Sequence, residues 1–173
     1  MIKLDKIDRK ILYELDLNAR ILLSKLAKKL KLSRDVVSYR TNKLEKENVI
    51  KGYNAFIDSS KLGYKMYRVF FKFYSITNDQ YKELVSSLSE NKNVFWIGET
   101  DGFVDLVFGA WFKESKEFND FYRTIVERFR LVIKQEYVNE LISYSYLDKL
   151  YLTDKKPIYR QEIVIGKNKE LKY

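Results

Sequence analysis

The sequence predicts an α+β protein in which three helices and a small hairpin precede a second domain of alternating strands and helices. Three observations predict this order. Apolar residues recur at helical spacing through residues 5–46, and from residue 67 onward strand-like alternation is interrupted by two helical stretches. In addition, residues 1–60 hold fourteen Lys and Arg against eight acidic residues, whereas residues 61–147 hold twelve of each. A basic module is therefore followed by a neutral one.

The basic module is expected to begin with two helices and a tight turn. The first helix starts near Asp5 and ends where residues 18–20 break the apolar period. The second, residues 23–30, has apolar residues at i, i+3, i+4 and i+7. Residues 31–32 then interrupt the pattern, and the hydroxyl of Ser33 is suited to cap a third helix.

The third helix has two chemically different faces. At about 100° per residue, Val37, Thr41 and Leu44 point toward the core. The opposite face is polar and basic, which equips it for base edges and phosphates in a DNA groove. The alternative is an ordinary solvated helix surface. The outward residues are Asp35, Ser38, Tyr39, Asn42, Lys43 and Lys46, with Arg34 and Arg40 beside them.

A small hairpin is predicted after the third helix. Asn48 sits at the helix end and accepts the left-handed conformation found there. Residues 49–50 are expected to form a strand, 51–52 a bend and 53–57 a returning strand. Three helices and a hairpin make a winged helix-turn-helix. Lys51, near the tip, is either a phosphate contact or a solvated turn lysine.

Residues 59–63 are the expected boundary, which divides the chain into a domain of residues 1–60 and a domain of residues 61–147. The order of elements in the second domain is βαββαβ, the ferredoxin-like arrangement. The expected strands are residues 67–73, 94–97, 104–112 and 132–147, with helices opening at residues 77–79 and spanning 118–129.

One face of this sheet is expected to lack a cover. Both helices of a βαββαβ domain pack on the same face, and this sheet is rich in Phe, Tyr and Trp. Because so much apolar surface is rarely left in water, we expect a second copy of the chain to cover it, giving a dimer or a higher even oligomer.

The C-terminal extension, residues 148–173, has no obvious place in either domain. Residues 150–152 and 162–165 look strand-like and are separated by Lys155-Lys156-Pro157. Two roles are open for this extension: it extends the sheet, or it clasps a partner subunit.

Composition excludes several classes of protein. No run approaches the roughly 18 apolar residues of a membrane span, and the charged N-terminus lacks a signal core, so a cytoplasmic protein without a membrane partner is expected. The chain has no Cys and no His. It therefore lacks thiolate ligands, the usual zinc ligands and the commonest general base, and no metal, cofactor or catalytic residue is expected.

These features together resemble the Lrp/AsnC family of transcription regulators over residues 4–147. The first helix, residues 4–20, is close to the opening signature of that family, and residues 26–50 match its helix-turn-helix. Residues 102–105, Gly-Phe-Val-Asp, match its Gly-x-x-Asp turn in the ferredoxin-like domain, called the RAM (regulation of amino-acid metabolism) domain. Asn48 stands where the family usually has Gly.

The resemblance implies DNA contacts on nearly the residues that the helical geometry selects. Arg40 lies near the apolar edge of its helix and is expected to contact phosphate. Asp35 either accepts a hydrogen bond from cytosine or only favours the helix N-terminus. The predicted DNA-binding residues are Ser33, Arg34, Asp35, Ser38, Tyr39, Arg40, Asn42, Lys43, Lys46 and Lys51.

The resemblance also implies an effector site in the loop of residues 98–105. Its backbone N–H groups would meet a carboxylate, and Asp101 or Asp105 an ammonium group. The alternative is a plain hairpin turn with no ligand. The predicted effector-binding residues are Gly98, Thr100, Asp101, Gly102 and Asp105.

The predicted function is therefore that of a sequence-specific transcriptional regulator, acting on double-stranded DNA as an oligomer and responding to an amino acid or another small molecule. A DNA-packaging protein with little sequence preference is the alternative. An enzyme of similar domain plan is a third class, but the enzymes of that plan use histidines, which this chain lacks.

Overall fold

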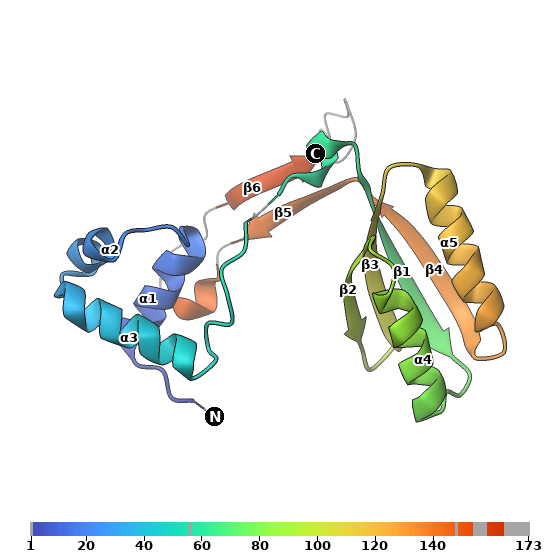
Figure 1. The fold of residues 1–173 in the computed structure, drawn as a ribbon, viewed down its shortest axis with the longest axis horizontal. Coiled ribbons are helices and arrows are strands. Elements are labelled where there is room, and N and C mark those ends of the chain that lie inside the picture. Colours follow the sequence, from blue (N-terminus) through green and yellow to red (C-terminus); the bar gives the residue numbers. More distant parts are fainter. Residues whose placement is uncertain (1, 56, 148, 154–158, 165–173) are drawn as a thin grey trace. The chain divides into compact units, whose positions relative to one another are not determined.

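The computed structural model describes residues 2–55, 57–147, 149–153 and 159–164 (Figure 1). Their contacts define two units. One unit comprises the described parts of residues 1–57 and 145–162, and the other comprises those of residues 58–144 and 163–173. The chain first passes from one unit to the other after residue 57, and the domain boundary expected from the sequence is near residue 60.

The first unit contains the three predicted helices, α1 (Lys6–Leu17), α2 (Leu23–Leu30) and α3 (Arg34–Lys46). Asp5 caps α1 in a reciprocal capping box with Asp8, and the hydroxyl of Ser33 caps α3 by accepting the N–H of Val36. The helices enclose a core whose fully buried members include Ile11, Leu26, Val37 and Leu44.

The turn between α2 and α3 is tight because Lys31 adopts a left-handed conformation with φ of 56°. The N–H groups of Lys31 and Leu32 then reach back to carbonyl oxygens of α2. This return brings Ser33 directly to the start of α3. The predicted helix-turn-helix is confirmed.

The predicted hairpin after α3 is wrong for the described residues 49–55 and 57, which form no strand. Asn48 is left-handed as expected, with φ of 56°. The N–H groups of Val49 and Ile50 both donate to the carbonyl of Leu44, so the chain folds back on α3. Further along, the hydroxyl of Tyr53 donates to Glu45 at 2.7 Å. A two-stranded ribbon alone is marginal in water, and these contacts to α3 replace it.

The second unit is the predicted ferredoxin-like domain. Its elements are β1 (Lys65–Phe73), α4 (Asn78–Ser89), β2 (Val94–Glu99), β3 (Leu106–Phe112), α5 (Ser115–Arg128) and β4 (Ile133–Leu141). The sheet is antiparallel with the order β2-β3-β1-β4. Thr77 caps α4 in a capping box with Gln80, as the polar residues before that helix predicted.

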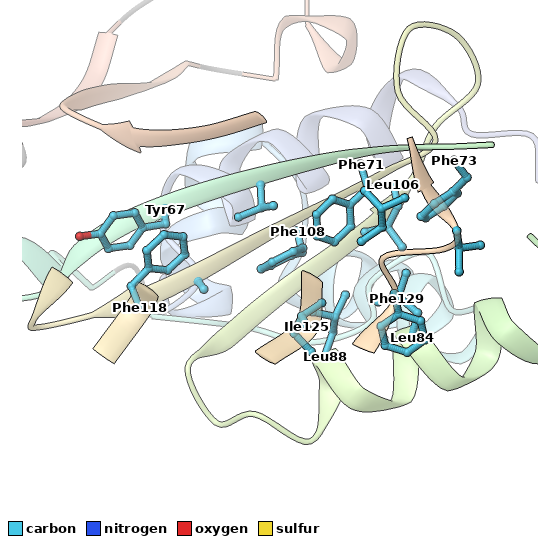
Figure 2. Close-up of a cluster of buried hydrophobic side chains, with 14 of the residues drawn as sticks. Tyr67, Phe71, Phe73, Leu84, Leu88, Leu106, Phe108, Phe118, Ile125 and Phe129 are labelled. Atoms are coloured by element: carbon cyan, nitrogen blue, oxygen red, sulfur yellow. The ribbon is translucent and has the colours of Figure 1, made fainter. Parts of the chain in front are cut away.

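The core of this unit lies between the sheet and its two helices (Figure 2). Phe71 on β1, Phe108 on β3 and Leu84 and Leu88 on α4 are fully buried. Tyr67 of β1 stacks on Phe118 of α5 with ring centroids 3.9 Å apart. The helices α4 and α5 therefore cover one face of the sheet.

The opposite face, here called the open face, is aromatic. A bulge between Val94 and Trp96 in β2 interrupts the alternation, and the rings of Phe95 and Trp96 lie over glycines. A Cβ atom on Gly109 would lie 2.6 Å from the Phe95 ring, and one on Gly98 would lie 2.6 Å from the Trp96 ring. Phe95 and Trp96 remain 48% and 46% exposed.

The predicted final strand, residues 132–147, is split. β4 ends at Leu141, and β5 (Ser143–Leu147) leaves the sheet to pair with β6 (Tyr159–Val164). Strand-like residues 150–152 form a short 3₁₀ helix, η2 (Leu150–Leu152), and not a strand. The predicted strand at residues 162–165 overlaps β6 up to residue 164, and residue 165 lies outside the described residues.

The described part of the extension contacts the first unit of the same chain. η2 lies against α1, and Lys149 forms an ion pair of 2.8 Å with Asp16 at the end of α1. The described parts of residues 145–162 therefore group with the helix-turn-helix.

Candidate DNA-recognition surface and effector pocket

The exposed side of α3 is the candidate recognition surface. Val37, Thr41 and Leu44 are buried in the core of the first unit, as predicted. Tyr39 is the most prominent outward side chain, with 70% of its surface exposed, and Ser38 and Arg40 are half-buried at the two edges. The exposed residues of α3 are Arg34, Asp35, Val36, Tyr39, Asn42, Lys43, Glu45 and Lys46.

Two predicted DNA-binding residues have structural roles at the start of α3. The Oγ atom of Ser33 accepts the N–H of Val36 at 3.2 Å, which leaves its hydroxyl proton as a donor. Asp35 lies in the first turn, where the helix dipole favours an acidic side chain. Both residues therefore help to begin the recognition helix.

Arg40 forms ion pairs with α1. One guanidinium nitrogen, Nη1, lies 2.6 Å from an oxygen of Asp5 and 2.8 Å from an oxygen of Asp8. The N–H of Asp8 and the Arg40 guanidinium hold the pKa of the Asp5 carboxyl below its usual 3.8. The same two carboxylates raise the pKa of Arg40. The edge position predicted from the helical period is confirmed, and its partners are protein carboxylates.

Arg34 and three lysines supply the positive charge of this surface. Lys43 lies 3.8 Å from Glu47, a long and exposed pair that leaves its ammonium group accessible. Lys46 is exposed in the last turn of α3, and Lys51 is exposed in the segment that follows. These three cations are spread over one end of the helix and the chain beyond it.

Val36 was absent from the predicted site. It follows the N-cap in the first turn of α3 and is 40% exposed. Its neighbour Val37 is fully buried. The helical period does separate these two valines by about 100°, but apolar character alone does not mark Val36 as a surface residue.

The loop predicted to bind an effector is held by Asp105. Its Oδ1 accepts from the ammonium of Lys72 at 2.6 Å, and its Oδ2 accepts from the N–H of Phe73 at 2.7 Å. Burial disfavours the charged carboxyl, but these hydrogen bonds outweigh burial and lower the pKa of Asp105. Lys72 also donates to the carbonyl of Gly102 at 2.9 Å. Sequence reasoning missed Lys72, which lies 33 residues before Asp105.

The other predicted loop residues divide into two groups. Gly98 lies within β2 under the Trp96 ring, and Gly102 has φ of 135°, a conformation that side chains rarely allow. Thr100 and Asp101, with Asp105, line a cavity of about 680 Å³. Lys72, Tyr81, Glu99 and Lys134 also line it. The cavity thus combines carboxylates and ammonium groups.

The described residues contain no candidate metal site. The chain has no His and no Cys, and no group of three or more Asp or Glu side chains in these residues is placed to hold a metal ion. No helix in the part of the chain that the structure describes is long and apolar enough to cross a membrane.

A basic three-helix unit with an exposed polar helix face, followed by a ferredoxin-like domain, defines a helix-turn-helix DNA-binding protein with a second, separate domain. Residues 4–51 match a family model described as winged helix-turn-helix DNA-binding. The chain is 32% identical over 120 residues to the HTH-type transcriptional regulator FL11 of Pyrococcus horikoshii, which covers 69% of this chain and 78% of that relative. It is 31% identical over 126 residues to an uncharacterized HTH-type transcriptional regulator of Pyrococcus furiosus, covering 72% and 81% of the two chains.

Solved structures share the fold. An AsnC family transcriptional regulator from Agrobacterium tumefaciens superposes with a TM-score of 0.70 at 24% identity, covering 80% of this chain and 90% of that chain. A transcriptional regulator of Neisseria meningitidis, solved in complex with L-Met, gives 0.71 at 19% identity with the same coverage. The chain belongs to the Lrp/AsnC family. It is a DNA-binding transcriptional regulator and not an enzyme.

The ion pairs of Arg40 predict a stability effect. We expect Arg40→Gln to lower the free energy of unfolding by about 1 kcal/mol at neutral pH, because the pairs are partly exposed. The matched control is Arg123→Gln, whose pair with Glu127 is fully exposed, and it should change little. Since folding lowers the pKa of Asp5, its contribution is present above pH 3.8 and is lost as the pH falls through the lowered value.

Urea unfolding at pH 7 and at about pH 2 measures this difference. Equal stabilities of the Arg40→Gln variant and the wild type at pH 7 would contradict the structural role. If the slope of log DNA affinity against log salt concentration fell by about one unit in the variant, Arg40 would instead be assigned to a phosphate contact.

Proposed function

We propose that the protein regulates transcription, and hence acts in the cytoplasm, by binding a two-fold-symmetric DNA site as a dimer or higher even oligomer, with α3 of each copy in a major groove. The exposed face of α3 carries this proposal. It is fixed on its far side by Val37, Thr41 and Leu44, and it presents hydrogen-bonding and cationic groups outward. Two recognition helices related by a two-fold axis read half-sites about one helical turn apart, or a multiple of it.

The alternative of a packaging protein makes a different prediction about sequence. A regulator selects a preferred sequence, whereas a packaging protein binds all duplexes with similar affinity. Selection from random duplexes, followed by fluorescence anisotropy on the selected site and on random DNA, separates the two. A selected site without two related halves, or equal affinities for the two DNAs, would contradict the proposal.

Residues on the recognition surface are expected to divide into phosphate and base contacts. We expect Lys43→Ala to weaken binding to all sequences alike and to reduce the slope of log affinity against log salt by about one unit, because one released counterion is lost. Asn42 carries a paired donor and acceptor that match adenine. Asn42→Ala is therefore expected to relax preference at one base pair, by about 1–3 kcal/mol, with the salt slope nearly unchanged.

Anisotropy titrations at several salt concentrations measure both effects. Lys82→Ala removes an exposed lysine of α4 in the second unit and is the matched control for loss of charge. The assignment would be wrong if Lys43→Ala removed specificity at constant salt slope. It would also be wrong if Asn42→Ala weakened specific and random DNA equally.

The open face of the sheet supports the proposed assembly. It exposes aromatic rings of β2 at one edge of the sheet and Tyr137 of β4, which is 39% exposed, at the other edge. Residues 61–147 are neutral overall, so two copies approach without net repulsion. We propose that a second copy covers this face.

Phe95→Asp is expected to break this assembly, because it places a charge in the apolar contact. Sedimentation should give a species heavier than 20.8 kDa for the wild type and 20.8 kDa for the variant. Leu131→Asp, at an 85% exposed position outside the open face, is the matched control and should remain assembled. A wild-type protein that sediments as a monomer at micromolar concentration would contradict the proposal.

The cavity beside the loop of residues 98–105 is proposed as an effector site for a free amino acid. Asp105 is already satisfied by Lys72 and Phe73, so Asp101 or Glu99 is assigned the ammonium group. Lys134 and the backbone N–H groups of the loop are assigned the carboxylate. The L-Met complex of the Neisseria meningitidis relative supports this class of ligand.

We expect Gly102→Val to abolish the response to this ligand, because a φ of 135° strains any β-branched residue. DNA affinity should remain, since the first unit is unchanged. Asp101→Asn tests the charge without backbone strain. Calorimetry against the common amino acids measures binding, and no heat with the unmodified protein would favour the plain-turn alternative.

A further inference from the structure

The recognition surface of α3 includes an apolar strip formed by Val36 and Tyr39. The hydrogen bonds to bases and the phosphate contacts proposed above do not use this strip. Val36 and Tyr39 are three residues apart on α3, so their side chains are neighbours on one side of the helix. Val36 is 40% exposed and Tyr39 is 70% exposed. A single exposed apolar residue is ordinary on a protein surface. Here two of them are neighbours in the first half of the recognition helix, with Tyr39 opposite the buried Val37 and Val36 about 100° from it.

The position of Val36 is fixed by the helix cap. Its N–H donates to the Oγ of Ser33 at 3.2 Å, and its neighbour Val37 is anchored in the core with no exposed surface. The side chain of a valine has one preferred rotamer in a helix. Val36 therefore presents its methyl groups as a rigid apolar surface, with little conformational freedom to lose on binding.

The surroundings of the strip identify its partner as DNA. On a helical wheel at about 100° per residue, Val36 lies beside Lys43 and Tyr39 lies beside Lys46. Both lysines are exposed. Both cations lie about two turns farther along α3, on the same side of the helix as the strip. They are suited to phosphates, so this side of α3 faces a DNA groove and not a second apolar protein.

The major groove contains one apolar group on the base edges, the C5-methyl of thymine. Helix-turn-helix proteins contact base edges with the N-terminal residues of the recognition helix, which is where Val36 lies. We propose that Val36, together with the ring of Tyr39, recognises a thymine methyl group and thereby contributes to sequence specificity. This inference rests on the proposed placement of α3 in the major groove.

Replacing thymine by deoxyuridine tests the contact, because it removes the methyl group and leaves the base pairing unchanged. In the selected duplex, each thymine is replaced in turn. For the wild-type protein we expect a loss of affinity of about fourfold at one or two positions per half-site, the worth of one buried methyl group, and no loss elsewhere.

Val36→Ala should remove that loss at one of these positions, so that the thymine and uridine duplexes bind equally. It should also leave the salt slope unchanged, because no charge is altered. Alanine favours a helix and the site is exposed, so the fold is retained. Leu22→Ala, which truncates a 62% exposed residue before α2, is the matched control and should keep the full loss. Tyr39→Phe should also keep it, because the ring and not the hydroxyl makes the contact.

Two results would overturn this inference alone: specific binding with no sensitivity to any thymine methyl group, or a full fourfold loss that persists in Val36→Ala at every position where the wild type shows it. If selection returned no preferred sequence, the proposed function and this inference would both be wrong. The two failures are therefore distinguishable.

Discussion

The orientation of α3 depends on one guanidinium group. Burial of Val37 and Leu44 holds α3 against the core, but apolar contact is non-directional and permits small rotations and slides of a helix. The hydrogen bonds that Arg40 donates to Asp5 and Asp8 are directional, with lengths of 2.6 and 2.8 Å. The same two carboxylates form the capping box at the start of α1. The start of α1 and the middle of α3 are thereby fixed to each other. The residues of α3 that are proposed to read DNA share this connection to the start of α1.

The second unit uses the same physical device at its loop. The Asp105 carboxylate joins the loop to Lys72 and to the backbone of Phe73, both on β1. This explains the Gly-x-x-Asp pattern in physical terms: Gly102 supplies the unusual backbone angle, and Asp105 ties the end of the loop to the sheet. The loop then places Thr100 and Asp101 at the cavity. A carboxylate held in this way fixes the loop that lines the cavity.

Local signals explain which parts of the fold were predictable from sequence. Asp5, Ser33 and Thr77 cap their own helices, so the N-terminal starts of α1, α3 and α4 follow from residues within three positions. The partners of Arg40 are 32 and 35 residues away in the sequence, so the apolar period of a single helix does not predict these contacts. The missing hairpin has the same cause, because residues 49–53 contact α3 instead of each other. Among site residues, the face of α3 was predictable and Lys72 was not.

The C-terminal extension shows how a distant contact changes the organisation of the chain. Its strand-like apolar residues form η2, which lies against α1, and Lys149 pairs with Asp16 beside it. The chain therefore passes between the two units after residue 57, after residue 144 and again after residue 162. Because α1 also receives the Arg40 ion pairs from α3, the extension and the recognition helix are both attached to the same helix. Helix α1 thus contacts both the extension and the helix that is proposed to read DNA.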